Sequence, residues 1–137
     1  MQFLVLLLIT IGNLHTDAGN KWLPEKILQI KVDDAGTVSA GRDTINTDNL
    51  ARYIQERLFK SYTGTGEMHS KIKLAKAGSH VPDIVMEVVG KEILEGQQRA
   101  LTDLCLLKYK SLFNDIEKRK QDKIKKQFPV LFQTDYQ

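Results

Sequence analysis

The stretch 81–116 constrains the fold most, because its apolar residues repeat at the spacing of one helix face. These residues are Val81, Ile84, Val85, Val88 and Val89 in its first half and Leu101, Leu104, Cys105, Leu112 and Ile116 in its second. Steps of three and four residues are typical of a helix that lies on a core. Pro82 suits the first helical position, where its missing N–H costs nothing. The sequence therefore predicts one long helix, or two helices joined near Gly96 in the polar segment 95–99.

A helix of this length has more apolar surface than a small sheet can cover. At about 1.5 Å per residue it is roughly 50 Å long, which exceeds the width of a small domain. We therefore expect its second half to pack on a second copy of the chain or to fold back on an earlier helix. The residues expected to make this dimer or partner contact are Leu101, Leu104, Leu107, Leu112 and Phe113.

The residues before this helix predict a small sheet and one further helix. Residues 27–32 alternate apolar and polar side chains, as a half-buried strand does, and a turn leads to a second strand over 37–45. Thr47 is placed to cap a helix over 48–62, and residues 68–75 alternate again. The order strand, strand, helix, strand, helix predicts an α+β fold with its helices on one face of the sheet. The helix between the second and third strands allows those two strands to be parallel.

The N-terminus carries an apolar run whose side chains include Phe3, Leu4, Leu6, Leu7 and Ile9. The run extends over only about 12–14 residues, whereas a membrane-spanning helix needs roughly 20. A secretory signal has an apolar region this short, but it normally starts with a positive charge, and none precedes Lys21. Two interpretations remain. Residues 1–18 are a signal peptide, or residues 1–14 are the outer part of a membrane anchor that is followed by a linker over 15–26.

The sequence contains no recognisable catalytic or metal-binding motif. His15, His69 and His80 are too far apart for a paired metal motif. Cys105, the single cysteine, lies on the apolar face of the long helix without a neighbouring histidine, so we expect a buried thiol. The net charge of +3 is too small to indicate a nucleic acid as partner. We therefore predict a protein that is not an enzyme and that uses no metal or cofactor.

Basic residues gather near the C-terminus, at Lys118, Arg119, Lys120, Lys123, Lys125 and Lys126. Such a run is most often a solvated helix face, although contacts with phosphates or lipid headgroups use the same residue types. The apolar segment 128–132 follows it, with aromatic residues at both ends. We favour a helix whose end pins Phe128 and Phe132 onto the domain; the alternative is a docking surface for a partner protein.

Several short motifs follow one another along the chain. Residues 1–9 are an apolar start, Leu23-Pro24 follows the linker, and Ile30, Gly36-Thr37-Val38 and Ile45 mark the predicted hairpin. Val81-Pro82 opens the long helix, and Phe128-Pro129 ends the basic segment. This order and spacing resemble the ExbD/TolR family of biopolymer transport proteins. Residues 95–136 depart from its compact members and resemble the variant common in Bacteroidetes, whose long helical extension ends in an aromatic-Pro pair.

The resemblance implies a membrane-anchored, non-enzymatic subunit of an energy transducer that the proton-motive force drives. Its expected partners are an ExbB-like channel subunit, a TonB-like energiser and a second copy of itself. The implied location is the bacterial inner membrane, with a single-pass anchor, a periplasmic domain over 27–117 and a basic extension over 118–137. The family's proton-coupling carboxylate is the Asp of its D-V-M stretch, which would fall just before Met1. We therefore assign proton coupling to no residue of this sequence, and we expect an in-frame upstream extension that encodes Asp-Val.

Two other classes of protein remain open. One is a secreted or periplasmic domain that binds a small ligand or a protein, with residues 1–18 as its signal peptide. The other is a soluble module that binds an acidic surface through residues 118–126. Both predict a soluble mature chain, whereas the transducer subunit predicts a membrane-bound one. The motifs do not distinguish a TonB system from a Tol system or a gliding motor.

Overall fold

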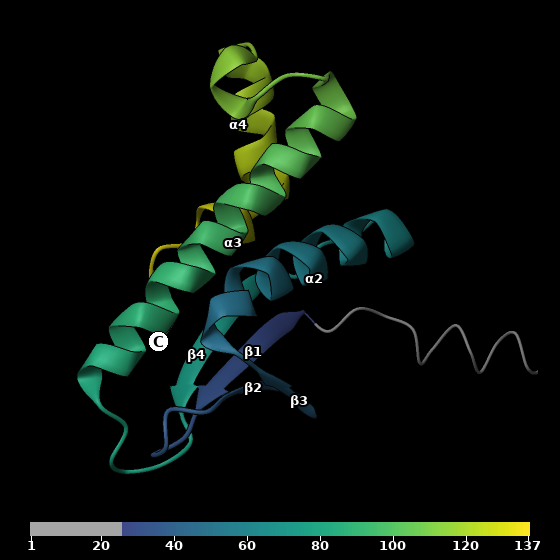
Figure 1. Ribbon diagram of the computed structural model, residues 1–137. Coiled ribbons are helices and arrows are strands. Elements are labelled where there is room, and N and C mark those ends of the chain that lie inside the picture. Colours follow the sequence, from purple (N-terminus) through teal and green to yellow (C-terminus); the bar gives the residue numbers. More distant parts are fainter. Residues whose placement is uncertain (1–25) are drawn as a thin grey trace, which may run out of the picture.

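The computed structural model describes residues 26–137, and Figure 1 shows how their helices and strands are arranged. The predicted anchor residues, the signal-peptide alternative and most of the linker lie outside this range. In chain order the elements are β1 (Ile27–Val32), β2 (Val38–Ala40), β3 (Asp43–Ile45), η1 (Thr47–Asn49), α2 (Leu50–Thr65), β4 (Lys71–Lys76), α3 (Asp83–Tyr109), η2 (Phe113–Asp115), α4 (Lys118–Gln127) and η3 (Pro129–Phe132), where η marks a 3-10 helix. The fold is α+β, as the sequence predicted.

The four strands form one mixed sheet in the order β3-β2-β1-β4. β2 is antiparallel to both β1 and β3, whereas β1 and β4 are parallel, with Ile27 opposite Lys71. The predicted second strand corresponds to β2 and β3: β2 runs antiparallel to β4, whereas β3 runs in the same direction as β4 without pairing with it. β2 occupies one edge of β1, so the chain that returns from α2 pairs with the other edge. The strand predicted over 37–45 is two strands, because a turn at Gly41, with φ of 61°, reverses the chain between them.

Side chains alternate between the two sides of this sheet. On β1, Leu28, Ile30 and Val32 are buried, and the residues between them are exposed. On β4, Ile72 and Leu74 are buried in the same way. The buried side chains form one core with those of α2 and α3, and both helices lie on that side of the sheet (Figure 1). The period-2 pattern of the sequence thus separates a helix-covered face from an open one.

The start of α2 differs from the prediction by one capping residue. A 3-10 turn precedes the helix, and the side chain of Asn46, not that of Thr47, accepts a hydrogen bond from the backbone N–H of Asp48 at 3.0 Å. An asparagine before the first turn satisfies one of the N–H groups that has no partner within the helix. At its other end α2 stops at Gly66, whose left-handed φ of 80° suits a residue without a side chain.

The long helix α3 is one continuous helix of 27 residues that passes through Gly96. Pro82 precedes it as the N-cap residue and is not its first helical residue. A Cβ atom on Gly96 would lie 2.5 Å from Cβ of Ile54 and 2.7 Å from the carbonyl oxygen of Ala51, so only glycine allows α2 to approach this closely. Within residues 26–137, no helix is both long and apolar enough to cross a membrane.

α3 ends at Tyr109, earlier than the predicted end at residue 116, and the chain then turns back along it (Figure 1). Residues of α4, η3 and the short connection between them enter the same core, namely Ile124, Phe128, Val130 and Leu131. The core that buries the apolar side chains of α3 thus contains residues of α2 and of the chain's own C-terminal segment. Residues 118–137, predicted as a separate extension, share one hydrophobic core with residues 27–117.

Candidate functional site

The five residues predicted to contact a partner do not form one surface. Leu104 is fully buried inside the chain, and Leu101 and Phe113 are partly buried against the core. Only Leu112 is half exposed, together with Leu107 from the same part of the chain. The sequence pattern identified an apolar face correctly, and this face belongs to one core with residues of α2, α4 and η3. A docking role for Leu104 is therefore wrong, because its side chain is part of the core.

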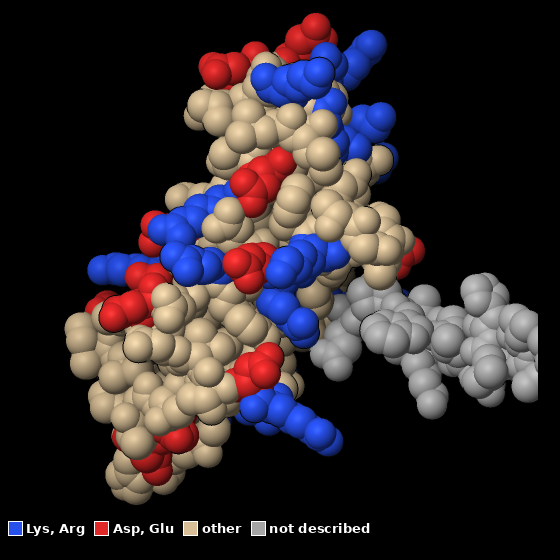
Figure 2. Space-filling model, turned by 45° about the vertical axis from the view of Figure 1, so that its right-hand side comes forward, with Lys and Arg blue, Asp and Glu red and all other residues tan. Residues whose placement is uncertain are grey.

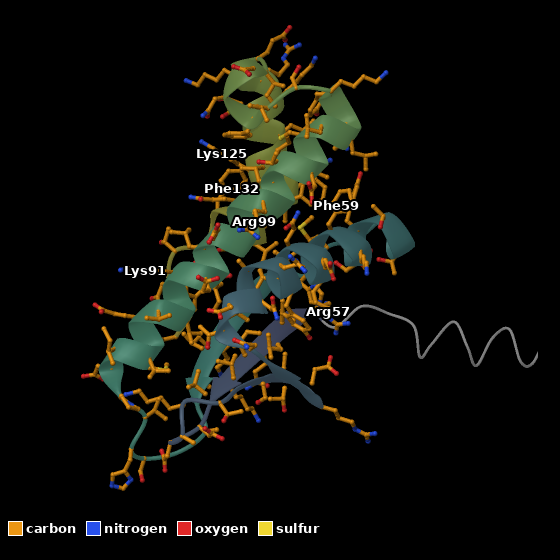
Figure 3. The ribbon with its side chains drawn as sticks, in the orientation of Figure 1. Arg57, Phe59, Lys91, Arg99, Lys125 and Phe132 are labelled. Carbon is orange, nitrogen blue, oxygen red and sulfur yellow. The ribbon has the colours of Figure 1, made fainter. Side chains whose placement is uncertain are left out.

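The basic segment is held to the domain by aromatic rings. Phe128 is buried and meets the ring of Tyr62 edge-on at 5.2 Å between centroids. The ammonium group of Lys125 lies 5.9 Å from the ring centres of Phe113 and Phe132, and Figure 3 shows Lys125 beside Phe132. These contacts confirm the prediction that the aromatic residues pin this segment onto the domain.

A buried amide clamps the C-terminus against α3. The side chain of Gln97 is fully buried, and its Nε2 donates to the carbonyl oxygens of Val130 at 2.7 Å and Gln133 at 3.0 Å. Its Oε1 accepts a hydrogen bond from the hydroxyl of Tyr136, and burial raises the pKa of that hydroxyl. In the sequence, Gln97 belongs to the polar segment 95–99 between the two apolar halves of the helix. Nothing in the local pattern showed that a segment more than thirty residues later would return to it.

The same C-terminal residues cover the outer edge of β4. The side-chain amide of Gln133 donates to the carbonyl oxygen of Ile72 at 2.6 Å and accepts from its N–H at 2.8 Å. The backbone N–H of Leu74 donates to the carbonyl oxygen of Tyr136 at 2.7 Å. A side-chain amide thus stands where the peptide group of a neighbouring strand would lie. Covering an edge in this way reduces its tendency to pair with a strand of another chain.

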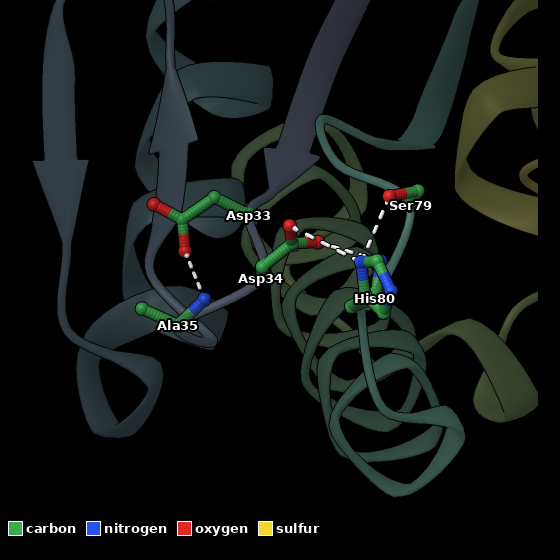
Figure 4. Close-up of polar contacts among 5 residues, drawn as sticks. All are labelled: Asp33, Asp34, Ala35, Ser79 and His80. Atoms are coloured by element: carbon green, nitrogen blue, oxygen red, sulfur yellow. Dashed lines mark hydrogen bonds and ion pairs between the residues drawn. The ribbon is translucent and has the colours of Figure 1, made fainter.

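A serine, a histidine and an aspartate meet beside the hairpin turn, and Figure 4 shows their contacts. Ser79 Oγ lies 2.9 Å from Nδ1 of His80, and Asp34 Oδ2 lies 4.0 Å from the same nitrogen. In a nucleophile relay the imidazole uses one nitrogen for the hydroxyl and the other for the carboxylate. Here both oxygens approach Nδ1, so the geometry is not that of a relay. The backbone N–H of His80 also donates to Asp34 at 2.8 Å, and the cluster fastens the loop before α3 to the turn after β1.

Two further kinds of site, a metal site and a reactive thiol, are not found within residues 26–137. No group of three or more His, Cys, Asp or Glu side chains in this range could hold a metal ion. Cys105 is fully buried, and burial raises the pKa of its thiol, which keeps it protonated. The expectation of a buried thiol at this position is confirmed.

The open face of the sheet carries charged residues of one sign only. We define it as the outward-facing residues of the four strands, which are Ile27, Gln29, Lys31, Ser39, Thr44, Lys71, Lys73 and Ala75. Three of the eight are lysines, and none is acidic. On α2 and α3, by contrast, some cations pair with acidic neighbours, as Arg99 does with Glu95 at 2.7 Å, and Figure 2 shows both signs of charge on the surface. The alternation in the sequence predicted which strand residues face outward, but it did not by itself indicate the charge that these residues form together.

A shallow groove of about 400 Å³ lies between the C-terminal residues and α3. Its lining includes Leu74, Met86, Gly90, Leu94 and Tyr136, and the charged residues Glu87 and Lys91 line it as well.

Comparison of the chain with protein-family models, with curated proteins and with solved structures finds no match.

Proposed function

We propose that this chain is a membrane-anchored, non-enzymatic subunit of a proton-motive-force-driven energy transducer of the ExbB–ExbD–TonB type. In this role the apolar run near the N-terminus holds the chain in the bacterial inner membrane. The domain over residues 26–137 lies in the periplasm, where it contacts an ExbB-like channel subunit and a TonB-like energiser and supports transport across the outer membrane.

The observation that carries the proposal is the position of the family-like motifs within the fold. Ile30 and Ile45 are buried residues of β1 and β3, in the hairpin that the motifs mark. Val81-Pro82 directly precedes α3, and Phe128-Pro129 opens η3. Motifs noted only for their order along the chain thus fall at the starts and in the cores of the corresponding elements. Such agreement between local sequence and global fold supports the resemblance.

The groove beside α3 favours a second candidate, a periplasmic domain that binds a small ligand. Its volume is at the lower end of the range of small-molecule sites, and its lining is mainly apolar. Residues 1–18 would then be a signal peptide, and the mature chain would be soluble.

The experiment that separates the two is fractionation combined with a transport assay in the native cell. The full chain, carrying an affinity tag, should remain in the membrane after an alkaline wash and should cross-link to the ExbB-like subunit. Loss of the chain should abolish energy-dependent uptake of a ferric siderophore, and the wild-type chain should restore it. A chain recovered entirely in the soluble periplasmic fraction, with unchanged siderophore uptake in its absence, would contradict the transducer role and favour the ligand-binding domain.

A further inference from the structure

The open face gathers positive charge on two adjacent parallel strands. The register places Lys71 opposite Ile27, Lys73 opposite Gln29, and Lys31 opposite Ala75. The lysines are therefore staggered, and none lies directly opposite another. Asp43, the one carboxylate within the four strands, pairs with the buried Ala40 and so belongs to the helix-covered side.

None of these three lysines takes part in an ion pair. Within residues 26–137 the cations that do so are Lys60, Lys76, Arg99 and, when protonated, His80. Charges of one sign on a single sheet face repel one another, and nothing in the core depends on lysine at these positions. A sheet face whose charged residues are all basic is complementary in charge to an extended anionic surface.

We propose that the open face docks on the anionic phospholipid headgroups of the membrane in which the chain is anchored. This step rests on the proposed function, which places the apolar run near Met1 in that membrane. Residues 15–26 then form the tether, and a dozen extended residues reach at most about 40 Å. The tether keeps β1 close to the headgroups, and lysines near an anionic bilayer are attracted to it within about one Debye length.

Docking would fix the orientation of the domain. α2 and α3 cover the opposite side of the sheet, so they face away from the bilayer when the open face lies on it (Figure 1). The groove beside α3 and the basic helix α4 would then be presented to periplasmic partners.

Lysine footprinting on the full chain with lipid vesicles tests the proposal. The chain is reconstituted with phosphatidylcholine vesicles and, separately, with vesicles that also contain phosphatidylglycerol, and an amine-acylating reagent is followed by mass spectrometry. Acylation of Lys31, Lys71 and Lys73 should slow at least about threefold on the anionic vesicles and recover at high salt. Lys60 on α2 and Lys123 on α4 are exposed controls that should react equally on both.

A chain that floats with both vesicles but shows equal acylation of the open-face lysines would overturn docking and leave the proposed anchor intact. A chain that floats only with anionic vesicles, is protected there and is released by salt would support docking and contradict the anchor. Protection without any vesicle would show that a second copy covers the face, and flotation with neither vesicle would overturn both ideas. The triple variant Lys31→Gln, Lys71→Gln and Lys73→Gln should lose the salt-dependent part of vesicle binding. The matched double variant Lys60→Gln and Lys123→Gln should keep it.

Discussion

The two faces of the sheet use the same strands for opposite purposes. On β1, Ile30 faces the helices and is fully buried, whereas the next residue, Lys31, faces away and is exposed. The buried set specifies how the strands pack under α2 and α3. The exposed residues contribute almost nothing to the core, so they are available for contacts with other molecules. Alternate residues of one strand therefore separate stability from recognition, and substitutions of neighbouring residues can test that separation.

The largest expected difference is between Ile30→Ala and Lys31→Ala. Removing the buried side chain leaves a cavity between the sheet and the helices, which should lower the free energy of unfolding by about 2–5 kcal/mol. Removing the exposed lysine next to it should change that free energy by less than about 0.5 kcal/mol. Urea unfolding of both variants and the wild type measures the difference. Similar losses for the two would show that the open face is covered in solution.

The next largest effect concerns the clamp on the C-terminus. Gln97→Leu would leave the carbonyl oxygens of Val130 and Gln133 and the hydroxyl of Tyr136 without their partner, which should cost about 1–3 kcal/mol. Gln98→Leu is the matched control, because Gln98 is the adjacent residue, has the same side chain and is exposed. Native-state hydrogen exchange at the N–H groups of Ile72 and Leu74 should accelerate only in the Gln97 variant. Equal exchange in both variants would show that the edge of β4 is held without the clamp.

Features repeated along neighbouring residues were predictable from the sequence, and long-range contacts were not. Alternation identified β1 and β4, and the helical step identified α3 with Leu104 on its apolar face. Gln97 was missed because its partners lie more than thirty residues away. The return of α4 and η3 to the core that contains Leu104 was missed because it too is a long-range contact. The turn at Gly41 was missed although alternation stops there, because three polar residues, 42–44, follow the glycine. The open face was implied by the exposed half of each strand pattern, but its charge becomes one surface only when β1 and β4 pair.

A smaller, pH-dependent effect follows from Cys105. Burial raises the pKa of its thiol in the folded chain, so unfolding releases a proton more readily at alkaline pH. The resulting stability is full below the ordinary thiol pKa and is lost as the pH rises through the raised folded value, at up to about 1.4 kcal/mol per pH unit. Thermal unfolding between neutral and alkaline pH should show a steeper loss for the wild type than for Cys105→Ala. Parallel curves would mean that the thiol is solvated in the folded chain.

The smallest effect compares two lysines of α4 that have the same charge but different neighbours. Lys125 lies over Phe113 and Phe132, whereas Lys123 forms no ring contact or ion pair within residues 26–137. A lysine near an aromatic face at an exposed site contributes about 0.5–1 kcal/mol, so Lys125→Gln should lower the free energy of unfolding by that amount. Lys123→Gln should leave it unchanged within error, because an isolated exposed charge contributes little. Urea unfolding at low and high salt measures both free energies. If both variants lose the same stability and salt abolishes the loss, the cause is the net charge of α4 and not the ring contact of Lys125. In that case α4 would resemble the open face, because its lysines would be available to bind an anionic partner and would not stabilise the fold.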